Sequence, residues 1–198
     1  VFTNNGEFYD FKYLRSNLMA EGERFSTKSD SEIALGLYRK MGVEFTRHLR
    51  GEFAFALYDR TEDELLLLRD RFGVRPLFYW VSPNGKTLIY GSEVKAILAH
   101  PAVPARLDRR AALHQMMQTI APGMSAFEGV HSLAPGHFLR IRKRGHKLDV
   151  ECIRYWDFDF PEDEERKTSL LDPQEYIEQV RHELVRSIVL RLEADVPV

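Results

Sequence analysis

The stretches Glu52–Asp59, EFAFALYD, and Glu64–Asp70, ELLLLRD, decide the fold class of this chain. In the first stretch large apolar side chains alternate with Ala54 and Ala56, so that both faces of the strand are apolar. The polar residues 60–63 between the two stretches predict a hairpin loop and hence antiparallel neighbours. A strand that is apolar on both faces predicts a sheet covered on both sides, which means a layered sandwich.

Two further strands follow the same scheme. The segments PLFYWV (residues 76–81) and TLIYGS (residues 87–92) are separated by a polar stretch that contains Asn84-Gly85. Asn-Gly is a strong signal for a two-residue hairpin turn. The four strands together therefore predict an antiparallel meander.

A third hairpin is predicted over residues 136–158, GHFLRIRKRGHKLDVECIRYWDF, with its turn near Gly145. Its basic run would suit a phosphate-binding patch. The run consists of Arg140, Arg142, Lys143 and Arg144. Because these charges alternate with apolar residues and lie beside the turn, they favour a solvated strand at a sheet edge, where charge opposes aggregation. We assign this run no function.

Several helices are predicted around these strands. Asp10 is expected to cap a helix that carries Phe11, Leu14 and Leu18 on one face. Gly22 is placed to end that helix.

The clearest helix signal is the S-x-x-E sequence from Ser29 to Glu32, which predicts a capping box. The apolar stripe that follows consists of Ile33, Leu37 and Met41. Gly42 is expected to end this helix. Shorter helices are predicted over residues 93–99 and 109–118, the second with Asp108 as its cap.

The last helix is predicted to begin at its cap Asp172, with Pro173 in the first turn and Glu175 completing a variant of the capping box. Its apolar stripe consists of Ile177, Val180, Leu184 and Ile188. The charged segment 161–168 precedes it and predicts a linker. We therefore predict one domain over residues 1–160, a linker over residues 161–171, and the beginning of a second domain over residues 172–198.

The composition favours a soluble globular protein without a nucleic-acid or membrane partner. Lys and Arg number 28 against 30 Asp and Glu, a formal net charge of −2, so no global attraction to nucleic acid or anionic lipid is expected. No apolar run approaches the ~20 residues that cross a bilayer. We expect a cytoplasmic protein.

Few residues qualify as catalytic or metal-binding candidates. The sequence contains no GxxxxGK[ST], GxSxG, HExxH or paired CxxC, and its seven histidines show no metal-ligand spacing. The single cysteine, Cys152, fits a reducing compartment, and its strand-like surroundings favour a small buried side chain over a nucleophile. RDRFGVRP, residues 69–76, favours an arginine–carboxylate network that fixes a tight connection over an anion site.

The stretch NNGEFYDF, residues 4–11, allows two interpretations. Asn5-Gly6 is the best sequence for a two-residue hairpin turn. Alternatively, the Asn5 side-chain amide and the Gly6 backbone N–H are two donors for one oxygen, as the transition state of acyl transfer requires. Glu7 and Asp30 would then be carboxylates that receive an ammonium group.

The order of seven segments resembles the glutamine-hydrolysing asparagine synthetases. These segments are, in chain order, NNGEFYDF, FSTKSDSE, LRGEFAFALYD, RDRFGVRPLFY, GSEVKAIL, PGMSAFEGVHSLAPGH and RYWDF. The resemblance covers nearly the whole chain. It implies a class II glutamine amidotransferase domain of the N-terminal nucleophile hydrolase type. The implied fold is α+β, a four-layer αββα sandwich of two antiparallel sheets between helices, here incomplete at its N-terminus.

The resemblance also implies roles for individual residues. In the family, a cysteine at the mature N-terminus attacks the side-chain amide of glutamine and releases ammonia. The family's oxyanion hole corresponds to Asn5 and Gly6, and its glutamine-binding glutamate to Glu7. The aspartate that holds the substrate's α-amino group corresponds to Asp30. No metal or cofactor is expected in this chain.

Two parts of the family's machinery are expected outside these residues. The nucleophilic cysteine and the arginine segment that grips the glutamine carboxylate would precede Val1, and the pyrophosphate loop of the synthetase would follow Val198. We therefore expect an internal fragment that is inactive alone. The synthetase domain would use ATP and Mg²⁺ to amidate aspartate. The expected partners are glutamine and this synthetase domain, and the resemblance allows a homodimer.

Two rival interpretations remain open. The first is a structural amidotransferase-like domain without glutaminase activity, as in the β-lactam synthetases; the retained Asn5, Gly6 and Asp30 weigh against it. The second is an interaction module that uses the Phe-rich sheet, and the ordered match of segments weighs against that.

Overall fold

The computed structural model describes residues 1–119, 122–160 and 172–192 of the 198-residue chain. It divides into two units, Val1–Asp157 and Phe158–Val198, which we describe separately. The strands of the first unit are β1 (Phe2–Phe8), β2 (Gly51–Asp59), β3 (Glu64–Arg69), β4 (Phe78–Val81), β5 (Leu88–Gly91), β6 (Val130–Ser132), β7 (His137–Arg144) and β8 (Lys147–Arg154). Its helices are α1 (Phe11–Ala20), α2 (Glu32–Met41), α3 (Val94–Leu98) and α4 (Arg109–Met116), with a 3₁₀ helix over Gly42–His48. In the second unit, α5 spans Pro173–Arg191.

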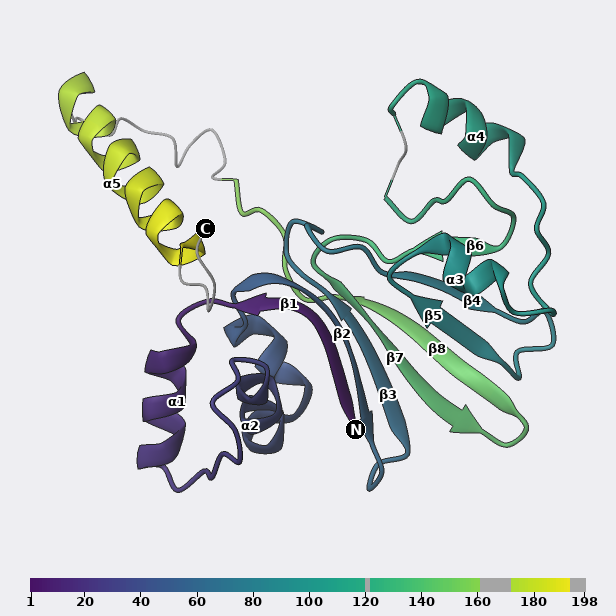
Figure 1. Ribbon diagram of the computed structural model, residues 1–198, viewed down its shortest axis with the longest axis horizontal. Helices are drawn as coiled ribbons and strands as arrows, with labels where there is room; N and C mark the ends of the chain where they lie inside the picture. Colours follow the sequence, from purple (N-terminus) through teal and green to yellow (C-terminus); the bar gives the residue numbers. More distant parts are fainter. Residues whose placement is uncertain (120–121, 161–171, 193–198) are drawn as a thin grey trace. The chain divides into compact units, whose positions relative to one another are not determined.

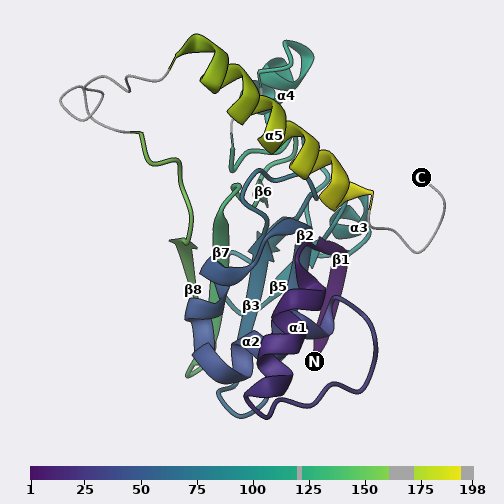
Figure 2. The same cartoon turned by 90° about the vertical axis from the view of Figure 1, so that its left-hand side faces the viewer.

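The strands form two antiparallel sheets (Figure 1). The larger sheet has five strands in the order β1-β2-β3-β7-β8, and the smaller has three in the order β5-β4-β6. Helices α1 and α2 pack on one face of the five-stranded sheet and lie in front of it in Figure 2. The three-stranded sheet packs on the other face of the larger sheet, and α3 packs against the smaller sheet. These layers confirm the predicted αββα sandwich.

The alternating side chains of β2 connect the helical layer with the second sheet. Phe53, Phe55 and Leu57 are buried in the cluster beneath α1 and α2. Ala54 and Ala56 point the other way and are buried between the two sheets. The prediction that both faces of this strand are covered is confirmed. Large side chains mark the helical face, and small ones mark the face where the sheets meet.

The predicted four-strand meander is wrong, because the chain changes sheets between β3 and β4. The β2–β3 and β4–β5 hairpins form as predicted. The loop between them is organised by Asp70, which is fully buried and whose carboxylate accepts the N–H groups of Phe72, Val74 and Arg75 at 3.0 to 3.1 Å. These bonds hold the turn that carries the chain from one sheet to the other.

Arg69 holds the same loop from its other side. Its guanidinium donates to the carbonyl oxygens of Gly73, Arg75 and Leu133 at 2.6 to 2.8 Å. The guanidinium of Arg75 in turn donates to Glu52 on β2 at 2.7 Å. The structure thus supports the predicted arginine–carboxylate network, because these side chains are engaged in fixing the connection.

The basic run on β7 does not lie at a sheet edge, contrary to the prediction. β7 lies between β3 and β8, and β8 is the edge strand. Glu64 on β3 is only 2% exposed and accepts hydrogen bonds from the Nε of Arg140 at 2.7 Å and the Nε of Arg142 at 2.6 Å. Two charges of this internal strand, those of Arg140 and Arg142, therefore neutralise a carboxylate buried on the neighbouring strand.

The helices predicted from their caps in the second half of the chain are confirmed. The Asp108 carboxylate accepts the N–H groups of Arg110 and Ala111 at 2.9 and 3.0 Å, and α4 follows it. The Asp172 side chain accepts the N–H of Gln174 at 3.2 Å at the beginning of α5.

The apolar stripe of α5 is exposed within its unit. It consists of Ile177, Val180, Leu184 and Ile188. No helix in the described part of the chain is both long and apolar enough to span a bilayer. The linker predicted over residues 161–171 and the end of the predicted second domain, residues 193–198, lie outside the described residues.

Two glycines allow an unusually close approach of β1 and β2. Gly6 has φ +137°, and a Cβ there would lie 1.9 Å from the carbonyl oxygen of Glu52. Gly51 has φ +145°, and a Cβ there would lie 2.1 Å from the carbonyl oxygen of Glu7. Only glycine combines these backbone angles with this lack of space.

Replacing Glu64 tests the buried ion pairs. We expect Glu64→Gln to lower the free energy of unfolding by roughly 3 kcal/mol, because it leaves two arginines without their carboxylate. The value lies at the low end for buried pairs because Arg142 is 41% exposed in its side chain. Urea denaturation of the purified chain measures the loss. Glu62→Gln on the exposed loop before β3 is the matched control, and an equal loss in both variants would contradict the assignment.

Replacing Gly6 tests the close approach of β1 and β2. We expect Gly6→Ala to lower the free energy of unfolding by ~3 kcal/mol or more, because backbone strain and overlap with Glu52 add together. Gly145→Ala is the control, since φ is +59° and nothing lies within 4 Å of the added carbon. There only the strain of about 1–2 kcal/mol applies. The same denaturation curves distinguish the two variants, and similar losses would argue against a steric constraint at Gly6.

Candidate functional site

Asn5 and Gly6 lie inside a strand, so the hairpin-turn interpretation of NNGEFYDF is wrong. β1 pairs with β2 without interruption, from Phe2 opposite Leu57 to Phe8 opposite Gly51. β1 is also an edge strand, because β2 is its neighbour on one side and the sheet ends on the other. Asn5, Gly6 and Glu7 are therefore on a sheet edge rather than in a loop.

The register decides which backbone groups of β1 face the open edge. Val1 and Tyr58 exchange two hydrogen bonds of 2.8 Å, and the N–H of Tyr9 donates to the Arg50 carbonyl at 2.8 Å. In an antiparallel pair, every second residue bonds to the partner strand and the residues between point away. Odd-numbered residues of β1 therefore bond to β2. The N–H and C=O of Gly6 point to the open edge.

Two side chains cover part of this edge. The Nδ2 of Asn4 donates to the carbonyl oxygen of Gly6 at 3.0 Å. The N–H of Phe8 donates to the Oδ2 of Asp30 at 2.7 Å. Both contacts agree with the register. The Gly6 N–H lies just before these two bonds along the edge and is also directed outward.

Asp30 is brought to β1 although 22 residues separate it from Phe8. Its Oδ1 accepts from the hydroxyls of Ser29 at 3.4 Å and Ser31 at 3.3 Å, and the residue is half-buried. A carboxylate has about four lone-pair positions, so Asp30 can still accept from a further donor. It bonds to the backbone of Phe8, the residue after Glu7, and Glu7 is exposed.

The loop that carries Asp30 is fixed by other hydrogen bonds than those of the predicted capping box. Ser29 and Glu32 do not form a capping box, and α2 begins at Glu32 itself. The Glu32 carboxylate reaches further back and accepts the N–H groups of Ser26 and Thr27, each at 2.8 Å. The hydrogen bond from Ser26 lowers the pKa of Glu32 below its ordinary value. The side chain thus ties the loop to the helix that follows it.

Arg15 on α1 secures the same loop. Its guanidinium donates to the carbonyls of Thr27 at 2.7 Å and Ser29 at 2.5 Å, and stacks on the ring of Phe25 at 4.5 Å. The predicted start of α1 is confirmed, but Asp10 does not cap it with its side chain. Asp10 pairs with Arg50 at 3.1 Å instead.

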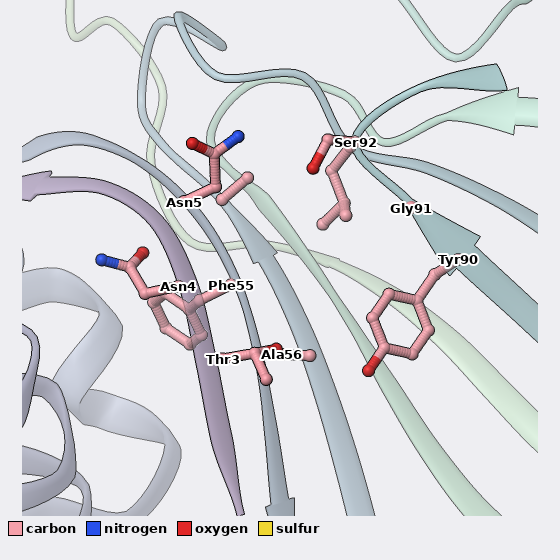
Figure 3. A pocket seen from close by; sticks show the side chains of 10 residues that line it. Thr3, Asn4, Asn5, Phe55, Ala56, Tyr90, Gly91 and Ser92 are labelled. Atoms are coloured by element: carbon pink, nitrogen blue, oxygen red, sulfur yellow. The ribbon is translucent and has the colours of Figure 1, made fainter. Parts of the chain in front are cut away.

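Asn5 lines a pocket of about 160 Å³ between β1, β2 and β5. Its lining comprises Thr3, Asn4, Asn5, Ala54, Phe55, Ala56, Leu77, Tyr90, Gly91 and Ser92. Figure 3 shows the Asn5 amide on the β1 side of the pocket, and the side chains of Ser92 and Tyr90 on the β5 side. One water needs only ~15 Å³, so the pocket can take part of a small organic molecule.

The chemistry of this pocket differs from that of the end of β1, where the carboxylates of the predicted site lie. Its lining contains hydroxyl, amide and apolar groups but no charged side chain. The two carboxylates, Glu7 and Asp30, are not among the lining residues. The site therefore offers an uncharged pocket at Asn5 and an acidic strand end two to three residues further along.

The pocket residues Thr3, Tyr90 and Ser92 were not predicted from the sequence. Thr3 shares a face with Asn5 only if the segment is a strand, and Asn and Gly are depleted in strands. Tyr90 and Ser92 stand in alternation within TLIYGS, but no sequence signal shows that this segment faces β1. Their role depends on the packing of one sheet on the other.

Cys152 lies on β8, as predicted for a strand residue, but it is exposed rather than buried. The reason is that β8 is an edge strand. Partial desolvation by its surroundings raises the pKa of the thiol, so little thiolate forms near neutral pH. Within the described residues no group of three or more His, Cys, Asp or Glu side chains could hold a metal ion.

Comparisons with known proteins agree with this site and fold. A family model described as glutamine amidotransferase domain matches residues 1–156. Asparagine synthetase [glutamine-hydrolyzing] 3 of Bacillus subtilis (strain 168) is 35% identical over 196 residues, which are 98% of this chain and 30% of that protein. Amidase chyE of Penicillium rubens is 37% identical over 194 residues, 98% of this chain and 27% of that protein.

A solved structure shares the fold. The glutamine phosphoribosylpyrophosphate amidotransferase of B. subtilis, complexed with ADP and GMP, gives a TM-score of 0.53 at 20% identity. The match covers 78% of this chain and 29% of that chain, and it confirms the fold of the N-terminal nucleophile hydrolase type. The chain spans less than a third of the length of the curated relatives named above. By its family match and its relatives, this chain belongs to the glutamine amidotransferase domain family.

Proposed function

We propose that this chain forms the oxyanion hole and the ammonium-binding part of a glutaminase site in a glutamine-dependent asparagine synthetase. The observation that carries the proposal is the outward N–H of Gly6 beside the Asn5 amide, on the same strand edge as the Asp30 carboxylate. Membership in the glutamine amidotransferase domain family supports it.

The proposed oxyanion hole consists of the Asn5 Nδ2 and the Gly6 backbone N–H. When a nucleophile attacks the carboxamide carbon of glutamine, negative charge develops on the carboxamide oxygen. Two donors that are already oriented stabilise this charge more than they stabilise the neutral amide. The ladder bonds of the neighbouring residues and the Asn4–Gly6 hydrogen bond keep the Gly6 peptide in place.

The opposite end of glutamine would lie at the acidic strand end. Its α-ammonium group would be held by Asp30, with Glu7 contributing a second negative charge. The uncharged lining of the pocket at Asn5 supports this orientation, because it favours the neutral carboxamide over the charged end of the substrate.

We propose that the nucleophile and the ammonia-consuming chemistry reside outside this chain. Cys152, the single cysteine, does not fit the role, because its raised thiol pKa opposes formation of a thiolate. ATP and Mg²⁺ would bind to a synthetase domain that begins with α5, and the exposed stripe of α5 supports packing within that domain.

We propose aspartate as the acceptor, as the resemblance to the asparagine synthetases implies. The synthetase domain would choose this acceptor.

Replacing Asn5 tests the oxyanion hole. In the complete protein, we expect Asn5→Ala to lower kcat for glutamine hydrolysis by ~10²- to 10³-fold, the usual effect of losing one oxyanion donor. KM should change little, since the donor acts mainly in the transition state. Coupled measurement of glutamate formation gives both parameters.

Cys152→Ser is the control for this experiment and should retain wild-type kcat. A wild-type protein without glutaminase activity would overturn the proposed function. Equal kcat in Asn5→Ala and wild type would remove Asn5 from the oxyanion hole.

Replacing Asp30 tests the ammonium site. We expect Asp30→Asn to raise KM for glutamine by roughly 10- to 100-fold, because a hydrogen bond to a charged group is worth about 1.5–3 kcal/mol. The amide keeps the shape of the side chain but not its charge. Asp63→Asn, on the exposed loop before β3, is the matched control. An unchanged KM in Asp30→Asn would place the ammonium group elsewhere.

A further inference from the structure

Asn4 lies directly before the proposed oxyanion donors, with its amide directed away from the Asn5 side chain (Figure 3). Its partner across the strand pair is Phe55, which belongs to the core beneath α1 and α2. A polar side chain on such an apolar face requires hydrogen-bond partners. The Nδ2 of Asn4 donates twice, to the carbonyl oxygen of Gly6 at 3.0 Å and to the Oγ of Ser31 at 3.1 Å.

These bonds close a ring that joins β1 to the beginning of α2. The Ser31 hydroxyl accepts from Asn4 and donates to the Oδ1 of Asp30 at 3.3 Å. The Oδ2 of Asp30 accepts the N–H of Phe8 at 2.7 Å, and the backbone from Phe8 to Gly6 completes the ring. The ring therefore contains the proposed ammonium acceptor and the carbonyl group of Gly6, the residue whose N–H is the proposed oxyanion donor.

The stability of the folded state alone does not explain why residue 4 is an asparagine. Its Oδ1 is buried and finds no hydrogen-bond partner within the described residues. A buried acceptor without a donor destabilises the folded state, and an apolar side chain of similar size would avoid this. Exchanging the two ends of the amide does not help, because Oδ1 would then face the Gly6 carbonyl, and both are acceptors.

We propose that Asn4 is a positioning residue that fixes the separation between the Gly6 N–H and the Asp30 carboxylate, and thereby selects substrates by length. This inference rests on the proposed function. Glutamine would reach from Asp30 to the oxyanion hole. Asparagine is one methylene shorter and cannot occupy both ends at once while the ring keeps them apart. A loose ring would tolerate both amino acids, because small displacements at a site change its geometry for reaction.

The test compares glutamine with asparagine as substrates of the complete protein. The measured quantity is the ratio of kcat/KM for glutamine to kcat/KM for asparagine. One methylene is typically worth ~10- to 200-fold in such a ratio, so we expect Asn4→Leu to lower it by about tenfold or more. Asn17→Leu, an exposed substitution of the same kind on α1, should leave the ratio unchanged.

If Asn4→Leu does not fold, two variants of Ser31 test the same positioning role. Ser31→Ala removes the link to Asp30 but leaves the Asn4–Gly6 bond, so the ratio should fall. Ser31→Thr retains the hydroxyl and should restore the wild-type ratio. This rescue separates positioning from a general loss of stability.

The outcomes distinguish this inference from the proposed function. A wild-type protein that does not hydrolyse glutamine overturns both. An active wild type whose ratio is unchanged in Asn4→Leu and Ser31→Ala, even where the melting temperature falls, overturns only the role of Asn4 in selecting length.

Discussion

The close approach of β1 and β2 at Gly6 and at Gly51 is the constraint on which the arrangement of the site depends. Each glycine leaves room for a carbonyl oxygen of the opposite strand, so that β1 and β2 approach closely where β1 reaches its last residues. The approach keeps the register uninterrupted to Phe8. The register in turn decides that Gly6 and Phe8 direct their peptide groups to the open edge, where Asn4 and Asp30 meet them. A side chain at either glycine would disturb all of these contacts together.

An open edge is usually a liability, because unpaired peptide groups attract further strands. Here side chains rather than another strand satisfy two of these groups, and they come from the loop before α2 and from β1 itself. The helices of the first layer therefore do more than cover the core. The loop before α2 carries Asp30, and α1 supplies Arg15, which holds this loop. The fold and the candidate site share these bonds.

The layered fold could be predicted because its signals are local. The alternation of Phe53 and Ala54 along β2, and the cap at Asp108, each concern a few neighbouring residues. The errors on the strands concern contacts between distant segments. The capping-box error is local, because Glu32 accepts from Ser26 and Thr27, only six and five residues before it, and nothing near Ser29 shows this preference.

For the candidate site, too, the residue types could be predicted locally, but their structural context could not. The residue types at Asn5, Gly6 and Asp30 suggested the chemistry, and the family resemblance gave each a role. The sequence did not show that Asn5-Gly6 lies in a strand, because its signal for a turn is strong and the partner strand begins at Gly51. The buried pairing of Glu64 with β7 likewise bridges 76 and 78 residues, so the basic run on β7 taken alone looked like a solvated surface. That pairing also bears on the order of folding. During synthesis the β2–β3 hairpin is complete long before Arg140 and Arg142 are made, so Glu64 must remain hydrated until β7 arrives. Contacts of such high sequence separation make folding slow. The larger sheet can therefore close only late, after most of the first unit has been synthesised.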